Sequence, residues 1–133
     1  MNTFVFRNNT VEFFFGSKDT TYSGYDDISF IPVDADEYIW FYQVPIKEDA
    51  DQMVAETESY IDKLGLVLNS VPSDKRFIIF TLSNIFSLQY TGDDFRLREA
   101  VMQFDKYAYD MERQYPNIKV LDLDEFLLRY PSS

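Results

Sequence analysis

The stretch KRFIIFTLSN, residues 75–84, decides the fold of this chain. Two basic residues precede an unbroken apolar run at 77–80, which then turns polar toward Asn84. Such a run is typical of a central parallel strand, because helices cover that strand on both faces. Ligands of open α/β sheets bind beyond the carboxyl ends of the strands, so residues 81–84 are the first candidates for function.

Composition excludes several kinds of chemistry. The 133 residues are enough for one domain with a single core. The chain has neither cysteine nor histidine, which excludes thiolate and histidine metal sites and both Ser-His and Cys-His pairs. The net charge of -11 argues against binding to nucleic acid or to an anionic membrane. No run is long enough to span a membrane and no signal-peptide pattern is present, so we expect a cytoplasmic protein.

Five segments have the apolar, β-branched or aromatic character of strands. They are residues 3–7, 28–33, 38–44, 77–80 and 118–123. Residues 17–27 lack periodicity and are predicted to form a loop. Residues 10–15 leave two alternatives open, the second strand of a hairpin or a short helix capped by Asn9 or Thr10.

The first long helix is predicted to begin after Asp49, an N-cap residue with Gln52 three positions on. Its apolar residues have helical spacing, and it should end by Val71 because Pro72 disfavours helical geometry in the residue before it. Gly65 lies inside this helix and costs about 1 kcal/mol relative to alanine unless close packing requires it.

A second long helix is predicted to open at Gly92, Asp93 or Asp94 and to end before Pro116. One or two further helical turns are expected within residues 125–130. Strands that alternate with helices imply right-handed crossovers. We therefore expect one α/β domain over residues 1–133, with three layers and a mostly parallel sheet of four or five strands, flavodoxin-like or SGNH-like, covered by helices on both faces.

Carboxylates suggest two kinds of site, and both have simpler explanations. Asp122-Leu-Asp124 follows an apolar strand, as does the DxD motif of haloacid-dehalogenase-type phosphatases. That motif lies on the first strand of its domain, so we expect Asp122 or Asp124 to cap a short terminal helix instead. The acidic pairs lack the spacing of an EF-hand loop and are expected to form caps and turns, so no metal site is predicted. These pairs are Asp26-Asp27, Asp34 with Asp36, and Asp93-Asp94.

A serine-hydrolase interpretation fails for want of a base. Gly16-Ser17 and Asn84 could be remnants of a hydrolase in which serine attacks and glycine and asparagine stabilise the oxyanion. No histidine exists to take the serine proton. Asn84 then remains either a polar group at the end of a strand or a turn residue.

Aromatic residues gather around the second and third predicted strands. One interpretation places them in the core with tyrosine tips reaching water. The other makes them an interaction surface. The residues assigned to that surface are Tyr22, Tyr25, Trp40 and Tyr42.

Several segments together resemble the N-terminal region of FkbH-like proteins, the subfamily IIIC branch of the haloacid dehalogenase superfamily. They are SGYDDI at 23–28, YIWFYQVPI at 38–46, FIIFTLSN at 77–84 and VLDLDEF at 120–126. The resemblance covers essentially the whole chain. It implies an SGNH-like domain followed, after residue 133, by a phosphatase-like catalytic domain that would hold magnesium. No cofactor is expected in the present domain.

The same resemblance implies a biosynthetic role. Proteins of this family are associated with making glyceryl-acyl-carrier units from a phosphorylated glycerate, or with polysaccharide and capsule biosynthesis. The implied partners are the downstream catalytic domain in cis and an acyl carrier protein. Aligned on the first strand, Asn8, Asn9 and Thr10 would occupy the nucleophile loop of an SGNH domain, and Asn84 its later asparagine position.

The leading hypothesis is therefore a non-catalytic N-terminal accessory domain of a phosphatase-like enzyme, which positions or docks a substrate or partner. Its candidate ligand-binding residues are Asn8, Asn9, Thr10 and Asn84. One alternative is a self-standing acidic module for protein interaction, motivated by the net charge. The other is a degenerate SGNH hydrolase.

Overall fold

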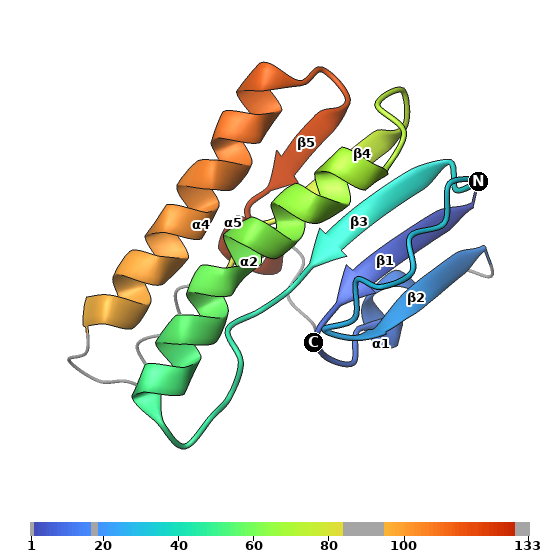
Figure 1. The fold of residues 1–133 in the computed structure, drawn as a ribbon. Helices are drawn as coiled ribbons and strands as arrows, with labels where there is room; N and C mark the ends of the chain where they lie inside the picture. Colours follow the sequence, from blue (N-terminus) through green and yellow to red (C-terminus); the bar gives the residue numbers. More distant parts are fainter. Residues whose placement is uncertain (1, 17–18, 84–94, 130–133) are drawn as a thin grey trace.

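The computed structural model describes residues 2–16, 19–83 and 95–129. They form five strands with helices on both sides, and Figure 1 shows α2 and α4 on one face and α1 and α5 on the other. The elements are β1 Thr3–Arg7, α1 Glu12–Phe15, β2 Thr20–Tyr25, β3 Glu37–Phe41, α2 Ala50–Ser70, β4 Arg76–Phe80, α4 Phe95–Gln114, β5 Ile118–Leu121 and α5 Leu123–Arg129. No helix of the described ranges is long and apolar enough to cross a membrane.

The sheet has the strand order β2-β1-β3-β4-β5, and every neighbouring pair is parallel. This confirms the predicted three-layer α/β fold with a parallel sheet, and the order is that of flavodoxin-like proteins. The chain leaves β1 toward one edge and leaves β3 toward the other. The switch point, where ligands bind in open sheets, therefore lies beyond the carboxyl ends of β1 and β3.

Two cores lie on the two faces of the sheet. Along β3, Tyr38 and Trp40 belong to the core beneath α2 and α4, whereas Ile39 and Phe41 belong to the core beneath α1 and α5. The alternation follows from the pleat, which sends successive side chains to opposite faces. Residues 77–80 of β4 are buried on both faces, as the continuous apolar run predicts.

Helix α2 agrees with its sequence signals. Asp49 is its N-cap, and the Asp49 side chain accepts a hydrogen bond from the Asp51 amide at 2.9 Å. Val71 is the C-cap, as expected before Pro72. Gly65 faces α4, and a Cβ built there would lie 3.3 Å from the Tyr107 hydroxyl, so the glycine does serve close helix packing.

Two predictions around the second strand were wrong. Thr20–Tyr25 forms the edge strand β2 within the segment predicted to be a loop, and an edge strand with one neighbour needs little apolar character. Residues 28–33 form no strand. Ile28 and Ile31 pack on the core beneath α2 while Phe30 stays 67% exposed, so this segment covers the sheet where a crossover helix would otherwise lie.

The remaining ambiguities are settled for the described residues. Helix, and not strand, forms within residues 10–15, but α1 starts after Val11, and neither Asn9 nor Thr10 caps it. Asp122 does cap α5, because its Oδ1 accepts from the Glu125 amide at 3.1 Å. The predicted start of the second long helix at residues 92–94 lies outside the described ranges, and α4 is described from Phe95.

Candidate functional site

A cavity of about 680 Å³ lies at the carboxyl edge of the sheet, at the switch point between β1 and β3. Its walls come from the ends of β1, β2 and β3 and from α1, α2 and α5. The lining residues are Asn8, Asn9, Phe13, Phe14, Tyr25, Asp26, Phe41, Gln43, Val44, Pro45, Ile46, Lys47, Glu56, Tyr60, Leu123 and Leu127. A volume of this order suits a small organic ligand.

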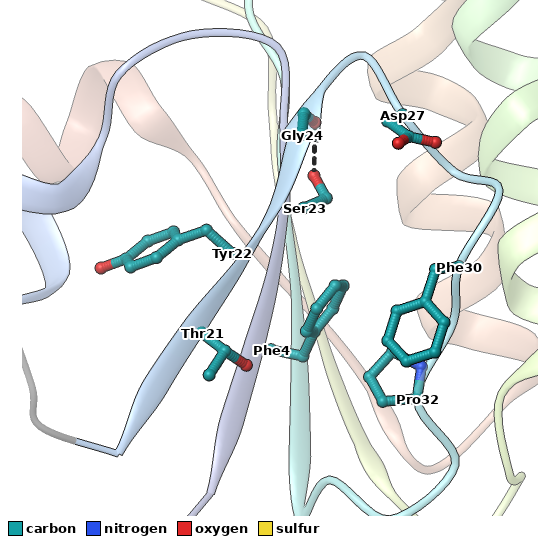
Figure 2. A pocket seen from close by; sticks show the side chains of 8 residues that line it. All are labelled: Phe4, Thr21, Tyr22, Ser23, Gly24, Asp27, Phe30 and Pro32. Atoms are coloured by element: carbon teal, nitrogen blue, oxygen red, sulfur yellow. Dashed lines mark hydrogen bonds between the residues drawn. The ribbon is translucent and has the colours of Figure 1, made fainter.

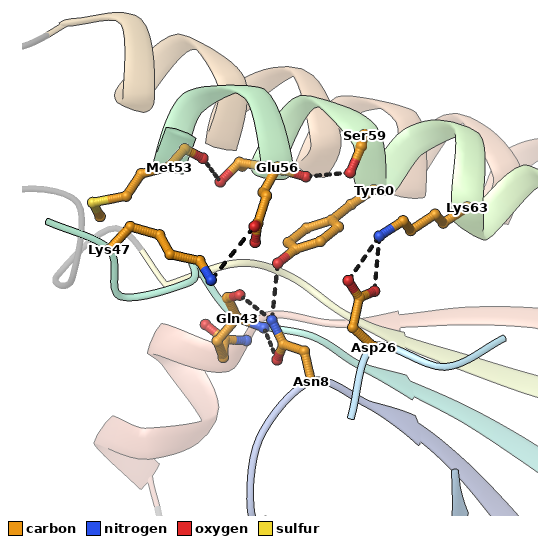
Figure 3. Close-up of polar contacts among 10 residues, drawn as sticks. Asn8, Asp26, Gln43, Lys47, Met53, Glu56, Ser59, Tyr60 and Lys63 are labelled. Carbon is orange, nitrogen blue, oxygen red and sulfur yellow. Dashed lines mark hydrogen bonds and ion pairs between the residues drawn. The ribbon is translucent and has the colours of Figure 1, made fainter. Parts of the chain in front are cut away.

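Asn8 is the centre of the polar wall of this cavity (Figure 3). Its amide nitrogen donates to the Gln43 carbonyl at 2.7 Å and to the Tyr60 hydroxyl at 2.9 Å. Its amide oxygen accepts from the Gln43 amide at 3.1 Å and from Asn9 Nδ2 at 2.7 Å. An asparagine side chain has two N–H donors and one carbonyl with two lone pairs, so Asn8 is saturated. It positions the wall and has no hydrogen-bonding capacity left for a ligand.

Other groups on this wall keep some capacity. Asn9 uses one amide hydrogen on Asn8, and its second hydrogen and its carbonyl oxygen have no partner within the described ranges. Tyr60 is buried, and its hydroxyl accepts from Asn8 while retaining its own hydrogen as a donor. Burial, partly offset by the Asn8 bond, raises the pKa of Tyr60, so the hydroxyl stays protonated at neutral pH.

The rim near β2 is held by Arg7. The Arg7 guanidinium lies 5.1 Å from the ring centre of Tyr22 and 4.7 Å from that of Tyr25, and it pairs with Glu12 of α1. Such cation–π contacts contribute about 0.5–1 kcal/mol each where solvent is near. The Thr10 hydroxyl lies 2.7 Å from the Tyr25 hydroxyl. Thr10 therefore steadies an aromatic wall and does not line the cavity.

Each carboxylate that lines the cavity is paired with a lysine. The Lys47 ammonium lies 3.5 Å from Glu56 Oε1, and the Lys63 ammonium lies 2.8 Å from Asp26 Oδ2 (Figure 3). Lys47 is the one cation among the described lining residues. The described part of the cavity wall thus offers no cation that is free of a carboxylate partner.

The mouth of the cavity is apolar. Phe13 is 83% exposed, Ile46 68% and Tyr25 60%, and all three line the cavity. Leu127 of α5 adds a further partly exposed apolar side chain. Exposed apolar groups that converge on one cavity are a signature of a binding site, whereas single exposed groups are common.

The predicted interaction surface needs correction. Trp40 and Tyr42 are fully buried and stack with ring centres 4.0 Å apart, so they belong to the core. Only Tyr25 is exposed, and Tyr22 is half-buried beside Arg7. A β-branched and aromatic run such as that of β3 is expected both for a strand covered by helices and for a strand covered by a partner. The sequence therefore left both interpretations open.

The predicted ligand-binding residues are divided by the structure. Asn8 and Asn9 line the cavity, Thr10 supports it through Tyr25, and Asn84 lies outside the described ranges. Gln43 and Tyr60 were missed as lining residues. Gln43 interrupts an apolar run just before Pro45, which was a usable signal. Tyr60 had none, because a tyrosine in a helical apolar stripe looks like any other core residue.

A second polar cluster lies at the ends of β4 and β5. The Gln43 side chain joins it to the cavity wall, since its Nε2 donates to the Thr81 carbonyl at 3.1 Å and its Oε1 accepts from the Ser83 amide at 2.9 Å. Ser83 Oγ donates to Asp124 Oδ1 at 2.7 Å. Asp122 and Asp124 are therefore engaged in capping and in this network, as the structural interpretation of the DxD expects.

Asp105 of α4 is the most perturbed carboxyl in this cluster. It accepts from the Leu82 amide at 2.9 Å. Burial raises the pKa of Asp105 to about 7, the Leu82 amide works against this shift, and the nearby carboxylates of Asp122 and Asp124 add to it. Within the described residues, no group of three or more acidic side chains is placed to hold a metal ion.

A smaller cavity of about 340 Å³ lies beside β2, between Phe4 and Phe30 (Figure 2). Its polar side chain at the centre, Ser23, accepts from the Arg7 amide and donates to the Gly24 carbonyl. These hydrogen bonds hold the edge strand in place. This cavity lacks the convergence of polar groups found at the switch point.

No protein-family profile, characterised protein or solved structure matches this chain.

Proposed function

We propose that this chain is a non-catalytic binding domain that holds a ligand or partner group for a phosphatase-like domain, the role implied by its resemblance to the N-terminal region of FkbH-like proteins. The observation that carries the proposal is the cavity of about 680 Å³ at the switch point of the sheet. Polar groups on one wall and apolar groups at the mouth are the usual composition of a ligand pocket.

The residues at this cavity support binding over catalysis. Nucleophilic catalysis needs a hydroxyl or thiol beside a base, and the chain has no histidine or cysteine. The loop after β1 carries Asn8, Asn9 and Thr10 where an SGNH hydrolase has its serine. Asn8 is saturated by hydrogen bonds, and the Thr10 hydroxyl bonds to Tyr25. Among the described carboxyls, the one with a strongly raised pKa is Asp105, and it does not line the cavity.

In this proposal, chemistry belongs to a partner domain. A phosphatase-like domain in cis would supply the DxD carboxylates and magnesium. An acyl carrier protein is a candidate carrier of the uncharged group that the cavity receives, and any phosphate is left to the phosphatase-like domain. The present chain contributes recognition through Tyr60, Asn9 and the apolar mouth.

The proposal is tested by binding and turnover measured on the same preparation. N-phenyl-1-naphthylamine, a neutral probe that fluoresces in apolar surroundings, is expected to bind in a saturable 1:1 manner. Ile46→Asp should weaken that binding at least tenfold, because it places a charge at the mouth. Val33→Asp is the matched control, since Val33 is 66% exposed, close to the 68% of Ile46, and does not line the cavity.

The turnover assay uses p-nitrophenyl esters and p-nitrophenyl phosphate, and rates at background are expected. Turnover that survives repurification and is lost on substitution of a lining residue would overturn the non-catalytic assignment. Absence of saturable probe binding, or equal weakening by Ile46→Asp and Val33→Asp, would overturn the binding assignment.

A further inference from the structure

We infer that the switch-point cavity selects an uncharged, amphiphilic small molecule and discriminates against ligands that carry phosphate, sulfonate or carboxylate. The inference rests on the proposed binding function and specifies its ligand. Three features of the cavity support it: the charges at the helix starts, the pairing of the lining lysine, and the hydrogen-bonding groups left open on the polar wall.

The first observation concerns the places where this fold usually binds anions. In open α/β sheets, phosphate and carboxylate groups sit at helix N-termini beyond the strand ends, where free amides and the helix dipole favour negative charge. Three of the helices that begin at this edge carry their own carboxylates there. They are Glu12 in α1, Asp49 and Asp51 in α2, and Asp122, Asp124 and Glu125 in α5.

These carboxylates already accept hydrogen bonds from free amides at the helix starts, which are then not available to a ligand. The Asp49 side chain accepts from the Asp51 amide, and the Asp122 side chain accepts from the Glu125 amide. The Glu12 carboxylate interacts with main-chain amides at the start of α1 and also pairs with Arg7, so this arginine is occupied as well. An anionic ligand would have to displace a carboxylate of the chain or sit beside it, and both are unfavourable.

The described walls of the cavity carry more carboxylates than ammonium groups. The described lining residues include two carboxylates, Asp26 and Glu56, and one ammonium, Lys47. Lys47 is directed to Glu56 and Asp26 is bound by Lys63. Among the described lining residues, an entering anion therefore meets no cation without a partner, while the net charge of -11 repels it at longer range. Burial of a charge without a partner is costly, so anions are disfavoured.

The polar wall has open hydrogen-bonding groups that would bind the polar part of a ligand. The Tyr60 hydroxyl can donate one hydrogen bond, and Asn9 can donate one and accept another. A hydroxyl, amide or ester carbonyl matches these neutral groups. The apolar part of the ligand would pack on side chains such as Phe14, Val44 and Ile46. The volume of about 680 Å³ favours a small molecule over a peptide, which generally needs a strand edge or a long groove.

The test compares two probes that differ by a single sulfonate. N-phenyl-1-naphthylamine is neutral, and 1-anilinonaphthalene-8-sulfonate is the same ring system with one negative charge. In fluorescence titrations at low ionic strength, the neutral probe should bind at least tenfold more tightly. Raising the salt to about 0.5 M should narrow this difference, because salt screens the repulsion.

Substitution of Glu56 tests the role of the Lys47 pair. Glu56→Gln frees the Lys47 ammonium, so it should tighten binding of the sulfonate probe several-fold and leave the neutral probe unchanged. Glu58→Gln is the matched control, because it removes the same charge from the exposed face of the same helix and does not line the cavity. Its effect on either probe should be less than twofold.

The outcomes separate the two proposals. If the sulfonate probe binds as tightly as the neutral one, or if Glu56→Gln and Glu58→Gln act equally, the discrimination against anions is wrong and the binding function stands. If neither probe saturates, the binding function itself is wrong and the inference falls with it.

Discussion

The Asn8 side chain and the Gln43 main chain exchange two hydrogen bonds beyond the ends of β1 and β3. Asn8 Nδ2 donates to the Gln43 carbonyl at 2.7 Å, and the Gln43 amide donates to Asn8 Oδ1 at 3.1 Å. β1 and β3 are parallel, and main-chain bonds between parallel strands are evenly spaced and slanted, so this mutual pair of bonds is made by the Asn8 side chain and is no continuation of the ladder. The ladder between the two strands ends at Arg7 and Phe41, and these two bonds fix the loop that follows β1 to the segment that follows β3.

Asn8→Ala should lower the free energy of unfolding by about 2–3 kcal/mol, because it leaves both polar groups of the Gln43 main chain without their partner. Urea denaturation monitored by tryptophan fluorescence measures this change. Asn69→Ala, at an exposed position of α2, is the control and should cost nothing. A loss below about 0.5 kcal/mol for Asn8→Ala would mean that these bonds contribute little net stability.

Two buried tyrosines should respond differently to loss of the hydroxyl. The Tyr60 hydroxyl accepts from Asn8, whereas the Tyr42 hydroxyl is buried near the Asp26 carboxylate without a partner at hydrogen-bond geometry in the described part of the chain. Tyr60→Phe should therefore cost about 1 kcal/mol, and Tyr42→Phe should be neutral or stabilising. Urea midpoints of the two variants, measured side by side, decide the matter. The reverse order would contradict the hydrogen-bond assignment at Asn8.

Stability should fall as the pH rises from about 4 to about 7, and Asp105 is the group responsible. Burial holds the pKa of Asp105 at about 7 in the folded protein, while the unfolded chain has the ordinary value near 3.8. Between these values the folded state binds the proton and the unfolded state does not, so raising the pH costs stability. The cost is on the order of 1 kcal/mol per pH unit within this window.

Asp105→Asn should remove most of that dependence, because asparagine is neutral and its oxygen can still accept from the Leu82 amide. Relative to the unsubstituted protein, the variant should gain stability between pH 5 and pH 8. Asp110→Asn is the control on the same helix, since hydrogen bonds from Lys106 and Arg113 lower the pKa of Asp110 and its titration falls below this range. Parallel pH profiles for the unsubstituted protein and Asp105→Asn would contradict the prediction.

Gly65→Ala should stabilise the protein by less than the roughly 1 kcal/mol that helix propensity alone would give. The new Cβ would lie 3.3 Å from the Tyr107 hydroxyl, which must shift to make room. In a Tyr107→Phe background the hydroxyl is gone, so the same substitution should give a larger gain. A double-mutant cycle from thermal unfolding measures the coupling. Equal gains in both backgrounds would show that the hydroxyl does not restrict this position.

Local signals predicted much of the scaffold. The continuous apolar run at 77–80 predicted a strand buried on both faces, and β4 is one. Asp49 and Pro72 predicted both ends of α2, because capping and the steric effect of proline act within a few residues. The edge strand β2 was missed because it gives no local signal. TTYSGY pairs with one neighbouring strand only and buries few side chains, so it needs no apolar run.

The sequence by itself determined the class of the fold, the absence of histidine and cysteine chemistry, and the position of Asn8 and Asn9 after the first strand. Only the tertiary structure decided that the Asn8 side-chain amide is hydrogen-bonded to Gln43 and Tyr60, which lie 35 and 52 residues away along the chain. It also decided that Trp40 and Tyr42 are core residues and that each lining carboxylate has a lysine. The physical reason is that periodicity, caps and turns depend on neighbours in sequence, whereas a cavity is formed by distant segments that meet only when the sheet assembles.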